Sequence, residues 1–226
     1  MIPYVLTRSR RKTVAIYVRN GAVEVRAPLS MLKKDIDRFV NEKETWILES
    51  LAKQRSRAEK KQGFFVDYGS EILYRGKHYP IRPHKSKKAV FDGEVFWLPD
   101  GLTPAQIKTV CIQMYRQLAK AYITNRVAAY AARMGVQPSA VKINNAMKRW
   151  GSCSSKKNLN FSWRLVMSAD NAIDYVVVHE LAHLTEMNHS ARFWAVVAAV
   201  LPNYRELQTQ LIKLQIKLSV EDWGLS

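Results

Sequence analysis

The sequence predicts an α+β protein with a small β-rich region at residues 1–101, which contains one helix, and a mainly helical region at residues 102–226. In the first region, short runs of alternating apolar and polar residues are separated by Asn-Gly, Gly-Lys and Asp-Gly pairs, a pattern typical of β-hairpins. In the second region, apolar residues recur every three or four positions over long stretches, as amphipathic helices require. The chain has 226 residues, 47% of them hydrophobic, which is ample for a packed core.

The N-terminal elements follow from these signals in chain order. A hairpin is expected over residues 13–27, with Asn20-Gly21 as its turn. A helix then begins near Ser30 and reaches about Gln62 before the break at Gly63. Its apolar stripe consists of Leu32, Ile36, Phe39, Val40, Ile47 and Leu51. Four short strands are expected over 71–75, 79–82, 89–91 and 94–98.

The C-terminal region is expected to begin with a long helix, started by Thr103-Pro104 and ended by Gly135. Strands follow at 141–143 and 158–163, joined by a loop over 148–155. Ser168 is the expected N-cap of the next helix. Ser190 is expected to cap a further helix that Pro202 stops, and the last helix is expected over 204–218.

A His-Glu-x-x-His pattern at His179, Glu180 and His183 is the strongest functional signal. Histidines four positions apart on a helix project from one face, where two imidazoles can bind one Zn²⁺. Glu180 lies about 100° around the helix from His179, so it can act as a base without binding the metal. His189 is the expected third ligand, which leaves the fourth coordination position for water.

The third ligand requires the chain to leave the helix after 185–187, because six further helical residues would turn position 189 well away from His183. Asn188 is the residue best suited to a left-handed, helix-ending conformation. Other ligand sets stay open at this point. Glu186 or Glu206 can replace His189 as the third ligand, and Cys153 can close the fourth position of a structural site.

The charge is strongly positive and unevenly distributed. The net charge is +17, and residues 102–167 contain 11 basic and no acidic side chains. Such a surface predicts non-specific nucleic acid or other phosphate-bearing molecules as partners, and a solvated basic surface is the alternative. The sequence shows no signal peptide and no apolar run long enough to cross a membrane, and Cys111 and Cys153 have no framework spacing. A cytoplasmic protein without a membrane partner is therefore expected.

Several segments together resemble the YgjP-like metallopeptidase family, which is related to the SprT-like and WLM zinc proteases. They are Arg8–Arg11, Val25–Pro28, Arg149–Cys153, Trp163–Leu165, Asp174–His183, Asn188–Ser190 and Phe193-Trp194. The resemblance covers nearly the whole chain. It implies a zincin-like catalytic domain at 102–226, with His179, His183 and His189 as zinc ligands and Glu180 as the base. The histidine spacing also matches the metzincins, but Glu186 replaces their glycine and no Met-turn methionine follows.

The expected reaction is hydrolysis of a peptide or protein by a zinc-dependent metallopeptidase. Residues 158–161 are either a candidate edge strand for an extended peptide or an internal strand with two buried apolar side chains. Candidate substrate-binding residues are Arg149, Ser152 and Arg164, and the oxyanion group is one of Arg149, Arg164, Arg192 and Tyr204. Two other functions remain. The family resemblance also leaves open a metal-dependent pyrophosphatase acting on nucleoside triphosphates such as UTP, and the basic charge leaves open a nucleic-acid-associated protein whose zinc is structural.

Overall fold

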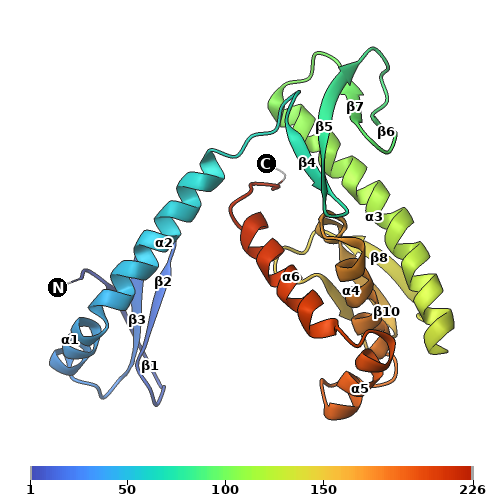
Figure 1. The fold of residues 1–226 in the computed structure, drawn as a ribbon. Coiled ribbons are helices and arrows are strands. Elements are labelled where there is room, and N and C mark those ends of the chain that lie inside the picture. Colours follow the sequence, from blue (N-terminus) through green and yellow to red (C-terminus); the bar gives the residue numbers. More distant parts are fainter. Residues whose placement is uncertain (1, 225–226) are drawn as a thin grey trace. The chain divides into compact units, whose positions relative to one another are not determined.

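The computed structural model describes residues 2–224, and these form two compact units. The first unit comprises the chain up to Phe64 together with Ser219–Asp222, and the second comprises Phe65–Leu218 together with the chain from Trp223 onward. Three β-sheets and six α-helices occur in the described residues, which confirms the α+β prediction (Figure 1).

The first unit is a three-stranded sheet covered by helices. Strands β1 (Val5–Ser9), β3 (Ala22–Pro28) and β2 (Ala15–Arg19) lie in that order, with β3 parallel to β1 and antiparallel to β2. Asn20 and Gly21 both have positive φ, at 51° and 74°, as the two-residue turn between β2 and β3 requires. One face of β3 buries Val23, Val25 and Ala27 against Ile36, Val40 and Ile47.

The helical part of this unit differs from the single helix predicted. Lys43, with φ −103° and ψ 12°, separates α1 (Lys33–Glu42) from α2 (Glu44–Gln62). The apolar stripe continues through this break, because Ile36, Val40 and Ile47 all enter the same core. The periodicity alone therefore could not reveal where the first helix ends.

A small mixed sheet begins the second unit. Its strands are β4 (Glu71–Tyr74), β5 (Lys77–His84), β7 (Phe96–Pro99) and β6 (Val90–Phe91), in that spatial order. β4 contacts the 3₁₀ helix η1 (Trp163–Met167), and the Arg75 amide donates to the Val166 carbonyl over 2.7 Å. The two compact units divide between residues 64 and 65, because the strands of this sheet pack with residues far along the chain.

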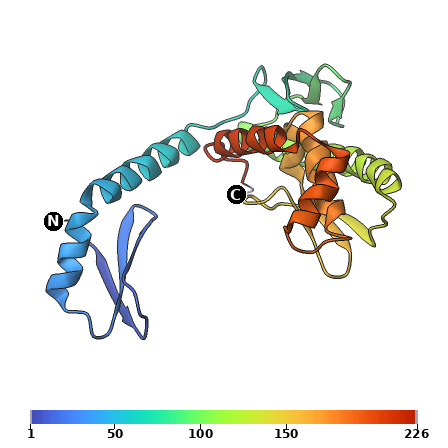
Figure 2. The same ribbon diagram turned by 60° about the horizontal axis from the view of Figure 1, so that its bottom comes forward.

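Helix α3 (Pro104–Met134) forms the long support of the second unit. The Thr103 hydroxyl accepts from the Gln106 amide in a capping box, and Gly135 ends the helix with φ 64°. Helix α4 (Asp170–Ala182) is buried on most sides, and it contacts α3, α5 (Ala191–Val200) and α6 (Tyr204–Leu218). Figure 2 shows α6 alongside α4 from a second direction. No helix among the described residues combines the length and apolar character needed to cross a membrane.

The third sheet lies beside α4, with strands in the order β8 (Ala140–Asn144), β10 (Asn158–Ser162) and β9 (Gly151–Cys153). β10 is the central strand, so residues 158–161 form the internal strand of the two alternatives and the edge-strand interpretation is wrong. The expected loop over 148–155 contains the short strand β9, which pairs antiparallel with β10. β9 is the edge strand on the side of α4.

Candidate metal centre

Two of the histidines are placed by the end of α4. His179 lies in the last helical turn, and His183 is the C-cap residue, with φ −65° and ψ −15°. The amides of Thr185 and Glu186 both donate to the Ala182 carbonyl, over 3.1 and 3.0 Å, and close a last turn before the chain leaves the helix. Asn188 is not among the described residues with positive φ, so the left-handed conformation predicted for it is wrong.

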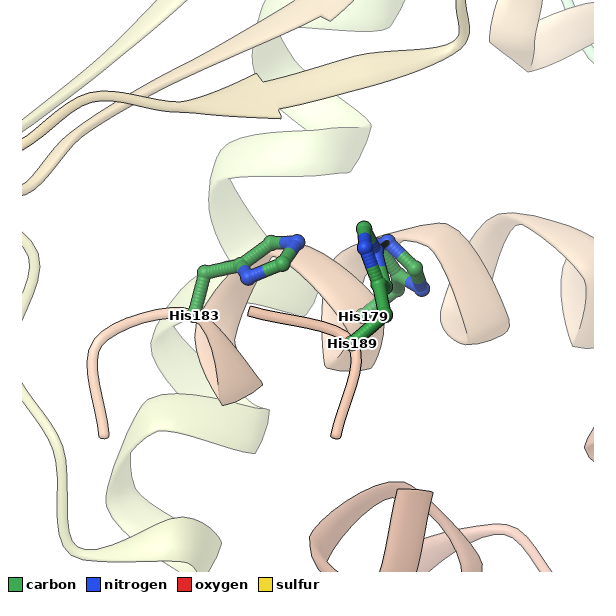
Figure 3. Close-up of side chains that lie close together, drawn as sticks. All are labelled: His179, His183 and His189. Carbon is green, nitrogen blue, oxygen red and sulfur yellow. Dashed lines mark hydrogen bonds between the residues drawn. The ribbon is translucent and has the colours of Figure 1, made fainter. Parts of the chain in front are cut away.

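The third histidine returns to the other two through this turn. Ser190 then caps α5, its hydroxyl accepting from the Phe193 amide. The three side chains point toward one another (Figure 3), and one ligand atom from each lies within 4.8 Å of the others. His179 Nε2 and His189 Nε2 are 3.1 Å apart. The turn therefore brings His189 back to His179 and His183.

The second ring nitrogen of two histidines is already engaged. The Nδ1 atom of His183 lies 3.1 Å from the Glu186 carbonyl oxygen, which can only accept, so this nitrogen holds the proton and Nε2 is free. The Nδ1 atom of His179 lies 3.3 Å from the Tyr175 hydroxyl, which also accepts from Gln208 Nε2 over 2.9 Å. Such contacts fix the orientation of metal-binding imidazoles.

Burial favours the neutral form of the histidines. It lowers the pKa of His179 to about 4 and also lowers the pKa of His183, and the neighbouring imidazoles act in the same direction. A neutral imidazole has the lone pair that a metal ion needs. The donor set thus fits a divalent metal ion. Within the described chain, Glu186, Glu206 and Cys153 do not belong to this group of ligand atoms.

The Glu180 side chain is buried against strand β9. It is 5% exposed, and a Cβ atom added to Gly151 would lie 2.5 Å from its Oε1 atom. Burial raises the pKa of Glu180 to about 8, and the positive charge of Arg149 opposes this shift. Only a glycine at position 151 leaves room for the carboxylate in this place.

A buried aromatic ring packs against all three histidines. The ring of Phe193, with 0% exposure, has its centroid 4.9, 4.5 and 4.7 Å from those of His179, His183 and His189. Phe193, Tyr175, Gly151 and Gln208 were not assigned roles from the sequence. Tyr175 had a usable signal, because it lies four residues before His179 on the same helix. Gln208, on another helix, had none.

The three substrate-binding residues predicted from the sequence lie in three different surroundings and do not form one group. Arg149 is exposed, and its positive charge tends to lower the pKa of Glu180. Side chains of a strand alternate between its faces, so Ser152 points away from the face on which Gly151 meets Glu180. Arg164 is 5% exposed and donates to Asn145 Oδ1 over 2.8 Å and to the Trp223 carbonyl over 3.1 Å. These contacts give Arg164 a packing role outside the metal centre.

Parts of the chain are similar to two solved structures. They are the metallopeptidase zymogens abylysin of Pyrococcus abyssi and jannalysin of Methanocaldococcus jannaschii, with sequence identities of 21% and 20% and TM-scores of 0.38 and 0.37. Each match covers 40% of this chain, and 92% and 94% of the respective structures. A comparison with curated proteins found no match.

The family comparison extends over most of the chain. The model of the YgjP-like family, described as a metallopeptidase domain, matches residues 12–214. This range includes most of each unit and the complete histidine cluster. The chain therefore belongs to the YgjP-like family of metal-dependent peptidases.

Proposed function

We propose that this protein is a zinc-dependent peptidase that binds the metal through His179, His183 and His189 and uses Glu180 as its general base. The observation that supports this most directly is the convergence of three imidazoles within 4.8 Å. Three nitrogen donors suit Zn²⁺ and leave a coordination position for a reactant, as catalytic zinc sites do. When bound, the ion supplies Lewis acidity toward the substrate carbonyl and toward water.

Glu180 moves the proton in the proposed reaction. Its carboxylate accepts a proton from the attacking water and donates it to the amine that leaves. The buried position beside Gly151 holds the carboxylate in one place and raises its pKa.

The peptide substrate is proposed to bind along the free edge of β9. The Ser162 amide donates to the Trp150 carbonyl and the Ser154 amide donates to the Asn158 carbonyl. Because backbone groups alternate along an antiparallel strand, those of Gly151 and Cys153 face the other edge. No strand within the described part of the chain pairs with that edge. An extended peptide bound there would lie beside Glu180.

Replacement of Glu180 tests this proposal. E180Q is nearly isosteric but cannot accept the proton, so we expect cleavage of casein or peptides to fall by about 10²–10⁴-fold while metal analysis still finds zinc. E186Q is the matched control, because the contact of Glu186 with the site is through its backbone carbonyl. Unchanged turnover in E180Q would remove Glu180 from the mechanism. Hydrolysis of nucleoside triphosphates without peptide cleavage would contradict the peptidase assignment.

The ligand set has its own test. H189A should lose most of its zinc, because two imidazoles alone bind the ion weakly. Metal content is measured after dialysis of the native protein and the variant against the same buffer. Full zinc occupancy in H189A would exclude His189 as a ligand.

A further inference from the structure

A continuous groove lies between α3 and β8, on residues that the peptidase proposal does not use. One depression of about 460 Å³ is lined by Arg116, Gln117, Lys120, Val141, Lys142 and Ile143. A second, of about 450 Å³, shares Gln117 and Lys120 and adds Ala121, Thr124 and Asn125. Because the two share lining residues, they form one feature, which we call the α3–β8 groove. The two elements lie side by side (Figure 1).

The groove has only positive charge. Arg116, Lys120 and Lys142 are exposed, and none of them makes an ion pair within residues 2–224. The segment 102–167 that forms both walls has no acidic residue. Two of its other cations are already engaged, since Arg126 pairs with Asp174 and Arg164 is buried. Three cations of this segment, free of ion pairs within the described residues, therefore line one hollow of the surface.

The remaining lining residues suit a phosphate backbone. Gln117, Thr124 and Asn125 are neutral hydrogen-bond donors on the same exposed face of α3, and side chains of these types commonly contact phosphate oxygens. Ala121 is small, so it lets a strand approach the helix closely. Positions 116 and 125 are about 14 Å apart along the helix axis at 1.5 Å per residue. A site of this length can contact more than one phosphate of a strand, since successive charges of one strand rise by about 3.4 Å along the duplex axis.

We propose that the α3–β8 groove binds nucleic acid without base specificity, through phosphate contacts from Arg116, Lys120 and Lys142. A flat lipid surface does not fit a concave site between a helix and a strand. An acidic polypeptide would use the cations but would leave the neutral donors without their preferred phosphate partners. The site is separate from the histidine cluster in its residues, so the proposal stands whether or not the chain cleaves peptides.

The proposal is tested by measuring how a fluorescein-labelled DNA duplex binds the full chain. Fluorescence anisotropy gives the affinity at about 50 mM salt and above. We expect R116E/K120E/K142E to lower affinity by at least tenfold, since each reversal removes a phosphate contact and adds repulsion. Each lost contact should also reduce the slope of log affinity against log salt by about 0.9. R116Q/K120Q/K142Q should show a weaker loss in the same direction, and it separates lost contacts from added repulsion.

The matched control is K85E/K87E/K88E, which makes the same change in net charge at three exposed lysines of the loop after β5. Its affinity should stay close to that of the native protein. Equal losses in the control and in the groove variant would show that net charge alone drives binding. The proposal would also be overturned if the native protein did not bind the duplex at about 50 mM salt. It would likewise be overturned if polyglutamate displaced the duplex as effectively as unlabelled DNA.

Discussion

At the scale of single residues, the metal centre depends on side chains outside the His-Glu-x-x-His pattern. Tyr175 holds the ring of His179 through its hydroxyl, and Gln208 holds that hydroxyl in turn. Gly151 gives the carboxylate of Glu180 its space. Tyr175 and Gln208 thus act on a candidate metal ligand, whereas Gly151 acts on the proposed base. Their substitution should therefore affect metal binding and turnover separately.

The first such change is Y175F, which removes the hydroxyl beside His179 Nδ1 and keeps the ring. We expect the zinc affinity to fall by about tenfold, at the lower end of what lost contacts to a ligand usually cost. Competition with a chromophoric chelator measures it. Y204F serves as the control, because Tyr204 stacks on Tyr175 and Trp194 but its hydroxyl does not contact a histidine among the described residues. Equal affinities of Y175F and native protein would show that the contact has no role in ligation.

The second change is G151A. The added methyl group would lie 2.5 Å from Glu180 Oε1 and 2.7 Å from its Cγ atom, so the carboxylate must move. We expect turnover to fall by at least about tenfold, as a displaced base requires, while zinc content stays at the native level. G63A is a control, since a Cβ atom there meets nothing closer than 3.7 Å. Native turnover in G151A would mean that the position of Glu180 is not critical.

At the scale of elements, α4 is held in place by ion pairs at its N-terminal half. Arg75, in the turn after β4, donates to Asp170 over 2.6 Å, and Arg126 of α3 donates to both carboxylate oxygens of Asp174 over 2.6 and 2.7 Å. Arg75 also lowers the pKa of Asp170. The negative charge of Asp170 in the first helical turn interacts favourably with the helix dipole as well. These contacts fix the helix whose other end presents the histidines.

The Asp170 pair predicts a pH-dependent difference in stability. Its folded-state pKa lies below the unfolded value of about 3.9, so its contribution is present above that value and is lost as pH falls through the folded pKa. We expect D170N to lower the Tm of the second unit near neutral pH by up to about 4 °C, because the pair is partly exposed. The difference should shrink below about pH 4. D100N, with no ion pair in the described structure, is the control; a difference independent of pH would assign the effect to packing.

Local signals in the sequence predicted most elements, and long-range contacts explain the errors. The hairpin at Asn20-Gly21, the ends of α3 and the existence of α4 to α6 follow from neighbouring residues, and so does the pairing of His179 with His183. The strand β1 could not be predicted locally, because its parallel partner β3 comes after β2 in the sequence. The short strand β9 was missed because only its pairing with β10 makes it a strand. The role of Gly151 depends on the same tertiary contact.

At the scale of the whole molecule, all three candidate ligands and the residues that orient them belong to the second unit. A metal that binds only the folded state stabilises the unit that binds it. In calorimetry we expect two transitions, of which only one moves to higher temperature when zinc replaces a chelator. H189A should abolish that shift. A single transition, or two that move together with zinc, would show that the units unfold cooperatively.

The contact from Gln208 to Tyr175 has a further consequence for how the protein is made. Helix α4 is complete once residue 182 has been translated, but its buried surface still awaits α5 and α6, and His179 awaits the tyrosine contact that Gln208 completes. A nascent chain on the ribosome therefore has its metal-binding sequence well before it has a formed metal site. The contacts that orient His179 are therefore completed only after α6 has left the ribosome.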